Sequence, residues 1–250
     1  MADFTDDAYT LDGFLGGRLM LHQPRKGHRA GHDAMLLAAS TTAKPGDRVV
    51  EFGAGVGAAG LALATRVPGL DLMLVEIDPV LADLGHQNAA RNRIAARAIT
   101  LDVTAGAEAF AAVGLPPDCA DVVLMNPPFN DPAKHRASPD AGRAVAHVAG
   151  PTTLADWVHA ARRTLKSSGA LTMIWRADGL AEVLVALKRG FGGLVIQPVD
   201  ARLEGAAIRV LVRAVKGGRA PLRLLPGLVL TSDEVVAALA TATGLSLGRT

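Results

Sequence analysis

The chain has 250 residues, half of them apolar, with a formal net charge of +2 and a single cysteine. This length can bury one full-sized core, and the lone Cys119 excludes an internal disulfide and fits a reducing cytoplasm. No run of about 18 apolar residues is present to span a membrane, and the acidic residues 1–10 lack the features of a signal peptide, so we expect a cytoplasmic protein.

The first 45 residues predict a small extension ahead of the main domain. Residues 11–22 are typical of a hairpin that turns at Gly16-Gly17, and a helix is expected from about Asp33 to Ser40. The sequence Lys-Pro-Gly-Asp at 44–47 then indicates a turn. We therefore expect residues 1–45 to pack on a catalytic domain that spans residues 46–250.

A glycine-rich turn follows the first strand expected in the main domain. Residues 48–52 (Arg-Val-Val-Glu-Phe) are typical of a buried parallel strand, and they lead into Gly53, Gly55, Gly57 and Gly60 and then an apolar helix. Such a turn lets a cofactor lie against bare backbone at a helix N-terminus. Residues 55–60 also match the dinucleotide fingerprint G-x-G-x-x-G, with Glu76 at the distance of a ribose-binding acid. The turn alone therefore leaves a nicotinamide enzyme open.

Three acids at the ends of successive predicted strands favour a different cofactor. Glu51 ends the first strand, Glu76 ends a strand over 72–75, and Asp102 ends a strand over 98–101. Beside the glycines, Glu51 would repel a pyrophosphate but attract the ammonium group of a methionine moiety. Glu76 can accept hydrogen bonds from both ribose hydroxyls, and Asp102 can accept one from an adenine amine. The set favours S-adenosylmethionine at the edge where open α/β sheets bind ligands.

The four residues Asn126, Pro127, Pro128 and Phe129 follow the apolar run 122–125. The side-chain oxygen of Asn126 and the backbone carbonyl of Pro127 can each accept one hydrogen of an exocyclic amino group. The prolines fix φ and remove competing donors, and Phe129 offers a ring on which a flipped base can stack. This arrangement suits methyl transfer to a flat amine, although Asn-Pro also marks ordinary turns.

Strand and helix signals alternate along the rest of the chain. Asp78-Pro79 predicts the start of a helix to about Arg93, and Thr153 with Asp156 predicts a capping box for a helix to Leu165, which Ser167-Ser168-Gly169 would stop. The remaining expected elements are a strand over 171–175, a helix over about 179–188, a strand near 194–196, a long antiparallel strand over 208–215 and a short helix capped by Thr231 with Glu234. Trp157 and Trp175 lie in apolar surroundings and are interpreted as core residues. The alternation indicates an α/β fold of Rossmann-like type.

Together these motifs resemble a known family. The chain resembles the class I S-adenosylmethionine-dependent methyltransferases with an Asn-Pro-Pro-aromatic motif, and within them it is similar to the bacterial tRNA adenine-N6 methyltransferases that act next to the anticodon of valine tRNA. The segment 23–38, with Gly31-His32-Asp33-Ala34-Met35-Leu36-Leu37, is similar to the N-terminal signature of that group. This segment separates the chain from the related glutamine methyltransferases that act on release factors. The likeness runs from about Gly17 to the C-terminal region.

The resemblance implies a fold, a cofactor and a site. The implied fold is a seven-stranded sheet with helices on both faces and an antiparallel last strand. The residues expected to bind S-adenosylmethionine are Glu51, Gly53, Ala54, Gly55, Gly57, Glu76, Ile77, Asp102, Val103, Asn126 and Asp33. The residues expected to act in catalysis are Asn126, Pro127, Pro128 and Phe129, on an adenine of tRNA.

The basic residues indicate where RNA would bind. Arg25-Lys26-x-His28-Arg29 and Lys134-His135-Arg136 with Arg143 are expected to border one pocket mouth and to hold phosphates. The series Arg209, Arg213, Lys216, Arg219 and Arg223 is interpreted as a solvated strand face. The seven histidines have no paired ligand spacing, so no metal is expected.

Three other functions remain open from the sequence. A glutamine-N5 protein methyltransferase would use the same four residues on a side-chain amide. A nicotinamide oxidoreductase would leave Glu51 and the Asn-Pro-Pro-Phe motif unexplained. A non-catalytic RNA-binding module would have no need of the donor-site acids. The sequence leaves both a monomer and a homodimer open.

Overall fold

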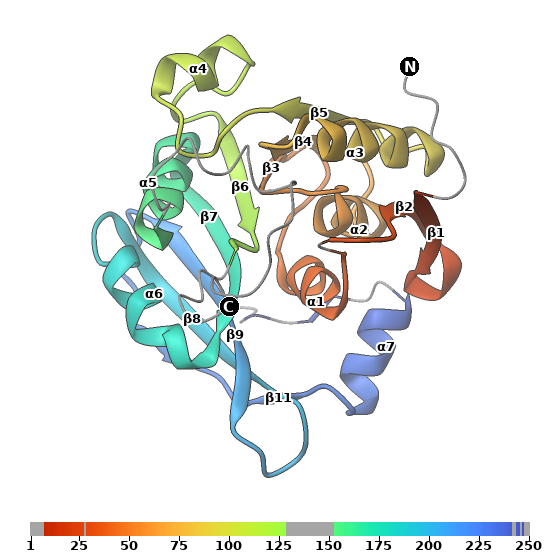
Figure 1. Ribbon diagram of the computed structural model, residues 1–250. Helices are drawn as coiled ribbons and strands as arrows, with labels where there is room; N and C mark the ends of the chain where they lie inside the picture. The colour runs from red at the N-terminus through yellow and green to blue at the C-terminus, as the bar shows by residue number, and fades with distance from the viewer. Residues whose placement is uncertain (1–7, 28, 129–152, 242–243, 246, 248–250) are drawn as a thin grey trace, which may run out of the picture.

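A mixed β-sheet with helices on both faces forms the body of the protein (Figure 1). The computed structural model describes residues 8–27, 29–128, 153–241, 244, 245 and 247. In chain order its elements are β1 (Tyr9–Phe14), η1 (Leu15–Gly17), β2 (Leu19–Pro24), α1 (His32–Ser40), β3 (Arg48–Phe52), α2 (Ala58–Arg66), β4 (Asp71–Glu76), α3 (Pro79–Arg91), β5 (Ala96–Thr100), α4 (Ala107–Ala112), β6 (Ala120–Met125), α5 (Leu154–Thr164), β7 (Leu165–Arg176), η4 (Ala177–Gly179), α6 (Leu180–Leu187), β8 (Phe191–Asp200), β9 (Ala207–Lys216), β10 (Arg223–Leu224), β11 (Leu228–Val229) and α7 (Asp233–Thr241).

The strand order confirms the expected sheet. Seven strands lie in the order β8-β9-β7-β6-β3-β4-β5, and β9 runs antiparallel to both of its neighbours, whereas β3, β4, β5, β6 and β7 run parallel. The two short strands β10 and β11 both pair with β8, so the sheet has nine strands within the described residues. β9, the last long strand in the chain, is therefore the antiparallel one.

Side chains alternate between two core layers along the central strands. Val49, Leu74, Leu124 and Ile174 face the layer that contains α1, α2, α3 and α7. The residues next to them point the other way, to the layer of α4, α5 and α6, which Figure 1 shows on the opposite side of the sheet. Since alternate residues of a strand share a face, Glu51, Glu76 and Asn126 point toward the α1–α2 side at the ends of their strands.

Capping signals located several helix starts correctly. The Asp78 side chain accepts a hydrogen bond from the Val80 N–H at 2.8 Å, with Pro79 in the first turn of α3. Thr153 and Asp156 form the predicted capping box of α5. The cap predicted for α7 is wrong by one residue, because the Ser232 hydroxyl, and not that of Thr231, accepts from a first-turn N–H, that of Val235, at 3.4 Å.

The helix stop predicted at Ser167-Ser168-Gly169 is also wrong. α5 ends at Thr164, and β7 begins directly at Leu165. Between the register pairs Ala120–Leu165 and Val122–Ala170, residues 166–169 bulge out of the β6–β7 pairing, with Ser168 at φ 65°. The small polar residues therefore form a strand irregularity, for which local sequence signals resemble those of a helix end.

The predicted N-terminal hairpin is present and is fixed to α3 by two asparagines. The Asn88 side chain accepts from the His22 N–H at 2.8 Å and donates to the His22 carbonyl at 3.1 Å. One turn later, Asn92 makes the same pair of bonds with Met20 at 2.9 and 2.8 Å. The two amides thereby hydrogen-bond the N–H and carbonyl groups on the edge of β2 that does not face β1, as a third strand would.

Candidate active site at the carboxyl ends of the strands

The predicted site residues gather at one edge of the sheet. Phe52 of β3 lies opposite both Val75 of β4 and Met125 of β6, so the residues that follow these strands are neighbours. Gly53, Glu76 and Asn126 therefore meet at this edge. Asp102 follows β5, whose extension is joined to β4 by a 2.8 Å hydrogen bond from the Leu101 N–H to the Glu76 carbonyl.

The glycine turn needs glycine for two different reasons. Gly53 has φ +65°, and a Cβ there would lie 2.5 Å from the indole of Trp157. Gly55 has φ +54°, and a Cβ there would meet no neighbouring atom within 4 Å, so its backbone faces open space. A ligand can therefore lie directly against the peptide at Gly55, while Trp157 supports the turn from below.

Glu51 holds this turn from within the core. Its side chain is 5% exposed, and its Oε2 accepts a hydrogen bond from the Gly60 N–H at 2.7 Å. Burial raises the pKa of Glu51 to about 8, although hydrogen bonds from the Gly60 and Ala59 N–H groups oppose the shift. The carboxyl group therefore points to the N-terminus of α2. It lies beneath the glycine turn, whereas the sequence placed it beside the turn.

Glu76 and Asp102 lie on the outer side of the turn. Glu76 Oε2 accepts from the Gly55 N–H at 2.7 Å, and Oε1 accepts from the Asp78 N–H at 3.0 Å. Among the described residues Asp102 accepts hydrogen bonds through Oδ1 alone, from the N–H and the hydroxyl of Thr104 at 2.8 Å each. Of the neighbouring residues assigned to the cofactor, Ala54 and Val103 are buried, whereas Ile77 is 45% exposed.

Asn126 and Pro127 follow β6 directly beside the glycine turn. Asn126 is half-buried and Pro127 is buried, whereas Pro128 is exposed. Within the described part of the chain no hydrogen bond is formed by the Asn126 side chain, so its amide oxygen remains available as an acceptor. Phe129 and the basic residues Lys134, His135, Arg136 and Arg143 lie outside the described residues.

The structure gives Asp33 a partner that the sequence did not indicate. Asp33, at the start of α1, forms an ion pair with Arg209 of β9, with 2.9 Å between Oδ2 and Nε. Their side chains are 29% and 28% exposed, so the interpretation of Arg209 as a solvated residue is wrong. The two residues are 176 positions apart, and no local pattern links them.

Arg29 is also held by hydrogen bonds within the protein. Its guanidinium donates to the Asp12 carboxylate at 2.6 Å and to the Thr10 hydroxyl and the Pro24 carbonyl at 2.9 Å. It therefore closes the loop after β2 onto the hairpin and is not available for a phosphate. Arg25 and Lys26 of the same cluster are exposed, and His28 lies outside the described residues.

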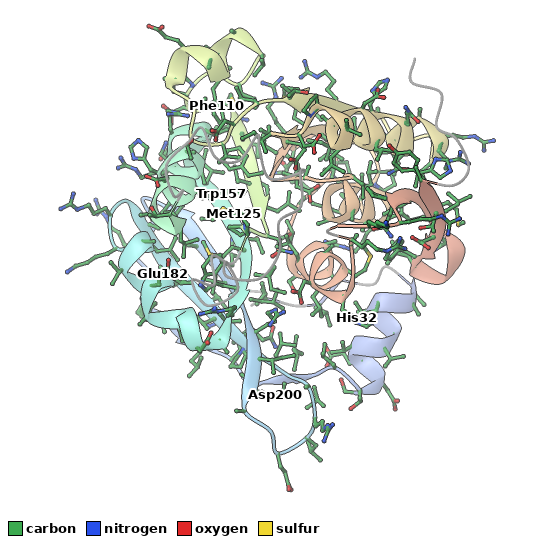
Figure 2. The ribbon with its side chains drawn as sticks, in the orientation of Figure 1. His32, Phe110, Met125, Trp157, Glu182 and Asp200 are labelled. Atoms are coloured by element: carbon green, nitrogen blue, oxygen red, sulfur yellow. The ribbon has the colours of Figure 1, made fainter. Side chains whose placement is uncertain are left out.

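Trp157 is a core residue, as expected, but it also reaches the site. It is 8% exposed and belongs to the same core layer as Met125, the last residue of β6 (Figure 2). Its contact with Gly53 could not be found from the sequence, because it depends on how α5 crosses the sheet.

The described residues offer neither a cluster of metal ligands nor a membrane-spanning helix. No group of three or more of their His, Cys, Asp or Glu side chains lies close enough to hold a metal ion. In the same residues no helix has the length and apolar character that crossing a membrane requires.

The sheet order, the glycine turn after β3, the acid after β4 and Asn-Pro-Pro after β6 define a class I S-adenosylmethionine-dependent methyltransferase. Comparison with protein families agrees with this class and narrows it. The chain belongs to the methyltransferase small domain family, whose model matches residues 30–197.

Three proteins similar to this chain are described by name. A crystal structure of a predicted O-methyltransferase from Agrobacterium tumefaciens is 30% identical, with a TM-score of 0.69, and the match covers 86% of this chain and 98% of that one. The tRNA1(Val) (adenine(37)-N6)-methyltransferase of Porphyromonas gingivalis is 26% identical over 185 residues, which are 69% of this chain and 68% of the relative. The release factor glutamine methyltransferase of Chlorobaculum tepidum is 25% identical over 196 residues, covering 75% and 66%.

Proposed function

We propose that this methyltransferase transfers the methyl group of S-adenosylmethionine to the exocyclic N6 of an adenine in tRNA. The observation that carries the proposal is the position of Asn126 and Pro127 at the end of β6, beside the glycine turn, with the Asn126 amide uncommitted among the described residues. The tRNA adenine-N6 methyltransferase of Porphyromonas gingivalis supports the choice of substrate.

The donor would bind across the ends of β3, β4 and β5. Gly53, Ala54, Gly55 and Gly57 offer a turn whose backbone is open at Gly55. Glu76 has a spare lone pair on each carboxylate oxygen for the ribose hydroxyls, and Asp102 has Oδ2 for the adenine amine. The exposed Ile77 and the buried Val103 would pack against the two faces of the adenine ring.

Two of the assigned residues would act without direct contact with the donor. Glu51 would keep the turn in place through its hydrogen bond from the Gly60 N–H of α2, and it would do so as a neutral acid below about pH 8. Asp33 would act through its ion pair with Arg209. Asn126 would border both the donor and the acceptor.

The chain's own residues would supply position and charge stabilisation for the transfer. S-adenosylmethionine, when bound, provides an electrophilic methyl group on an excellent leaving group, so the catalyst mainly has to orient the amine. The Asn126 oxygen and the Pro127 carbonyl would accept the two N6 hydrogens, draw the nitrogen toward tetrahedral geometry and stabilise its developing positive charge. The proton can leave to water afterwards, so no strong base is required.

The RNA would be held at the mouth of the site. Arg25 and Lys26 are exposed and can reach phosphates, and Lys134, His135, Arg136, Arg143 and the stacking residue Phe129 belong to the same proposal. The base has to leave its stack to enter, which favours an unpaired loop as the substrate.

A release factor glutamine is the second candidate substrate. A side-chain amide presents the same two hydrogens to Asn126 and Pro127, and the glutamine methyltransferase of Chlorobaculum tepidum is 25% identical to this chain. Both substrates therefore enter the same test.

The test offers both substrates to the purified protein with radiolabelled S-adenosylmethionine. We expect label in unmodified bulk tRNA, recovered after digestion as N6-methyladenosine, and none in release factor. The Asn126→Ala protein is the control, since it keeps the donor site and loses the acceptor contact. Label in release factor glutamine alone would replace the substrate, and label in neither would contradict both candidates.

A further inference from the structure

Two arginines face each other across β7 and β9. Arg176 is the last residue of β7, and it lies directly opposite Arg209 in the antiparallel pairing. Residues opposite each other in such a pair have Cα atoms about 4.5–5.5 Å apart, and like charges there destabilise the sheet. A pair of this kind at the end of two strands suggests a role other than stability.

The pair lies on the same face and edge as Asn126. Met125 is in register with Met173, so Asn126 comes level with Ile174, and Arg176 is two residues farther along the same face. Ile174 and Leu211 belong to the α1–α2 core layer, which fixes the direction of Arg176 and Arg209. β9 is two strands from β6, which corresponds to about 10 Å across the sheet.

The sheet order places the pair on the acceptor side of the site. The glycine turn, Glu76 and Asp102 follow β3, β4 and β5, whereas Arg176 and Arg209 belong to β7 and β9 on the other side of β6. Figure 2 labels His32 at the start of α1 and Asp200 at the end of β8, the two elements that flank the pair. A group bound by these arginines would therefore contact the substrate and leave the donor untouched.

The two guanidinium groups differ in how they are held. Arg209 is oriented by Asp33 at 2.9 Å and by the Ile208 carbonyl at 3.0 Å. Arg176 has its Nε 2.9 Å from Asp178 Oδ1, and their side chains are 37% and 73% exposed. The Nε–Asp178 contact is an ion pair without the geometry of a hydrogen bond, and among the described residues the two terminal nitrogens of Arg176 form no hydrogen bond. Most of its five donors are therefore available to a ligand.

We propose that Arg176 and Arg209 bind a backbone phosphate of the RNA substrate next to the target adenine, with Asp33 as the positioning residue for Arg209. The planar forks of two guanidinium groups match the oxygens of a phosphate, and they hold it more specifically than lysines do. The inference rests on the proposed function, since it requires an RNA substrate. It assigns Asp33 to the acceptor side, whereas the sequence placed it at the cofactor.

The test measures RNA affinity at several salt concentrations and, separately, donor affinity by calorimetry. We expect Arg176→Gln and Arg209→Gln each to weaken tRNA binding at least about fivefold and to lower the slope of log affinity against log salt by about 0.7. Donor affinity should stay within about twofold of wild type. Arg223→Gln is the matched control, because Arg223 is an exposed arginine on β10, and it should change neither quantity.

A conservative variant separates charge from geometry. Arg176→Lys keeps the charge and loses the fork, so the salt slope should persist while affinity falls. Because the ion pair of Arg176 is with the exposed Asp178, its loss should cost little stability, and the Arg176 variants carry the test even if Arg209→Gln destabilises the fold.

Three results would overturn the proposal. The first is that Arg176→Gln and Arg209→Gln have the same RNA affinity and salt slope as Arg223→Gln while the wild type methylates tRNA. In that case the proposed function would still stand. The second is a loss of affinity that falls on the donor. The third is a wild-type protein that binds the donor but neither binds nor methylates RNA, in which case the proposed function fails as well.

Discussion

Glu51 is a carboxylic acid in surroundings that exclude water. Its carboxyl group is 5% exposed and supports the N-terminus of α2 through the Gly60 N–H. Burial raises its pKa to about 8 from an ordinary value of 4.5. Between these two values the folded protein binds a proton at Glu51 that the unfolded chain does not, so Glu51 favours folding at low pH and this contribution is lost as the pH rises through 8.

Glu51→Gln should remove this pH dependence. Glutamine keeps an acceptor for the Gly60 N–H and cannot ionise, so its stability relative to wild type should rise between pH 5 and pH 8, by roughly 1–4 kcal/mol. Urea unfolding of both proteins at the two pH values measures the difference and cancels the titration of other groups. An equal difference at both pH values would show that Glu51 is ionised throughout.

In the proposed mechanism, methyl transfer depends most directly on Asn126. Asn126→Ala deletes the acceptor that would polarise the amine, and it should lower single-turnover methylation of RNA by about 10²–10³-fold. Donor affinity should change far less, because Glu76, Asp102 and the glycine turn remain. Near-full single-turnover methylation by Asn126→Ala, measured with calorimetric donor binding as the control, would contradict the proposed mechanism.

Asn126 and Glu51 show which features of single residues can be predicted from the sequence and which cannot. Asn126 and Glu51 stand within short motifs whose spacing is fixed by one strand and one turn, and the structure brings them to the expected edge. The direction of the Glu51 side chain, into α2, depends on packing that no spacing encodes. Arg209 was misread because its partner Asp33 is distant in the chain and α1 has to cross the sheet for them to meet.

At the scale of elements, two side chains of α3 hydrogen-bond to the backbone of β2, as a neighbouring strand would. Asn88 and Asn92 lie four residues apart on one face of the helix, and Met20 and His22 lie two residues apart on β2, so the two repeats match. Asn88 is fully buried and also donates to the Val56 carbonyl in the glycine turn at 3.1 Å. The hairpin and the turn therefore share one side chain.

Replacement of each asparagine should separate these two effects. Asn88→Ala and Asn92→Ala each remove the two hydrogen bonds that the side chain makes with the N–H and carbonyl of one β2 residue, so each should lower the free energy of unfolding by roughly 1–3 kcal/mol. Asn88→Ala should in addition weaken S-adenosylmethionine binding, because the Val56 carbonyl loses its donor. Denaturant unfolding measures the stability of each variant, and calorimetry measures its donor affinity. Equal donor affinities in the two variants would show that the Asn88–Val56 hydrogen bond does not support donor binding.

Helix starts were predicted correctly where a local capping motif marks them. Asp78-Pro79 and the pair Thr153–Asp156 located two helix starts because each cap is made by residues within one turn. The bulge at 166–169 was missed because it is set by the pairing of β7 with β6, a neighbour about 45 residues away in sequence. Local signals therefore fixed helix starts better than strand irregularities.

At the scale of the whole molecule, β6 divides the active edge into two halves. The residues proposed for the donor follow β3, β4 and β5, and the arginine pair proposed for the RNA lies on β7 and β9. The alternation of strands and helices predicted this sheet, and the glycine turn and acids are the basis of the proposed donor half. The acceptor half was less accessible to prediction, because its arginines come from two strands that meet only in the antiparallel β7–β9 pairing.

Donor binding should stabilise the whole fold, since the site joins three strands and the start of α2. A ligand that binds only the folded state adds about 2.7 kcal/mol at one hundred times its Kd, which corresponds to a rise in Tm of roughly 5–10 °C for a chain of this size. Glu76→Ala leaves the Gly55 N–H and the ribose hydroxyls without their acceptor, so donor affinity should fall by roughly 1–3 kcal/mol. At the same S-adenosylmethionine concentration the Tm shift should then shrink to between about two thirds and about one tenth of the wild-type value, as measured by thermal melting with and without the donor. NAD at equal concentration is the control ligand and should shift neither protein. A Glu76→Ala protein that is folded and shows the full wild-type shift would remove Glu76 from the donor site.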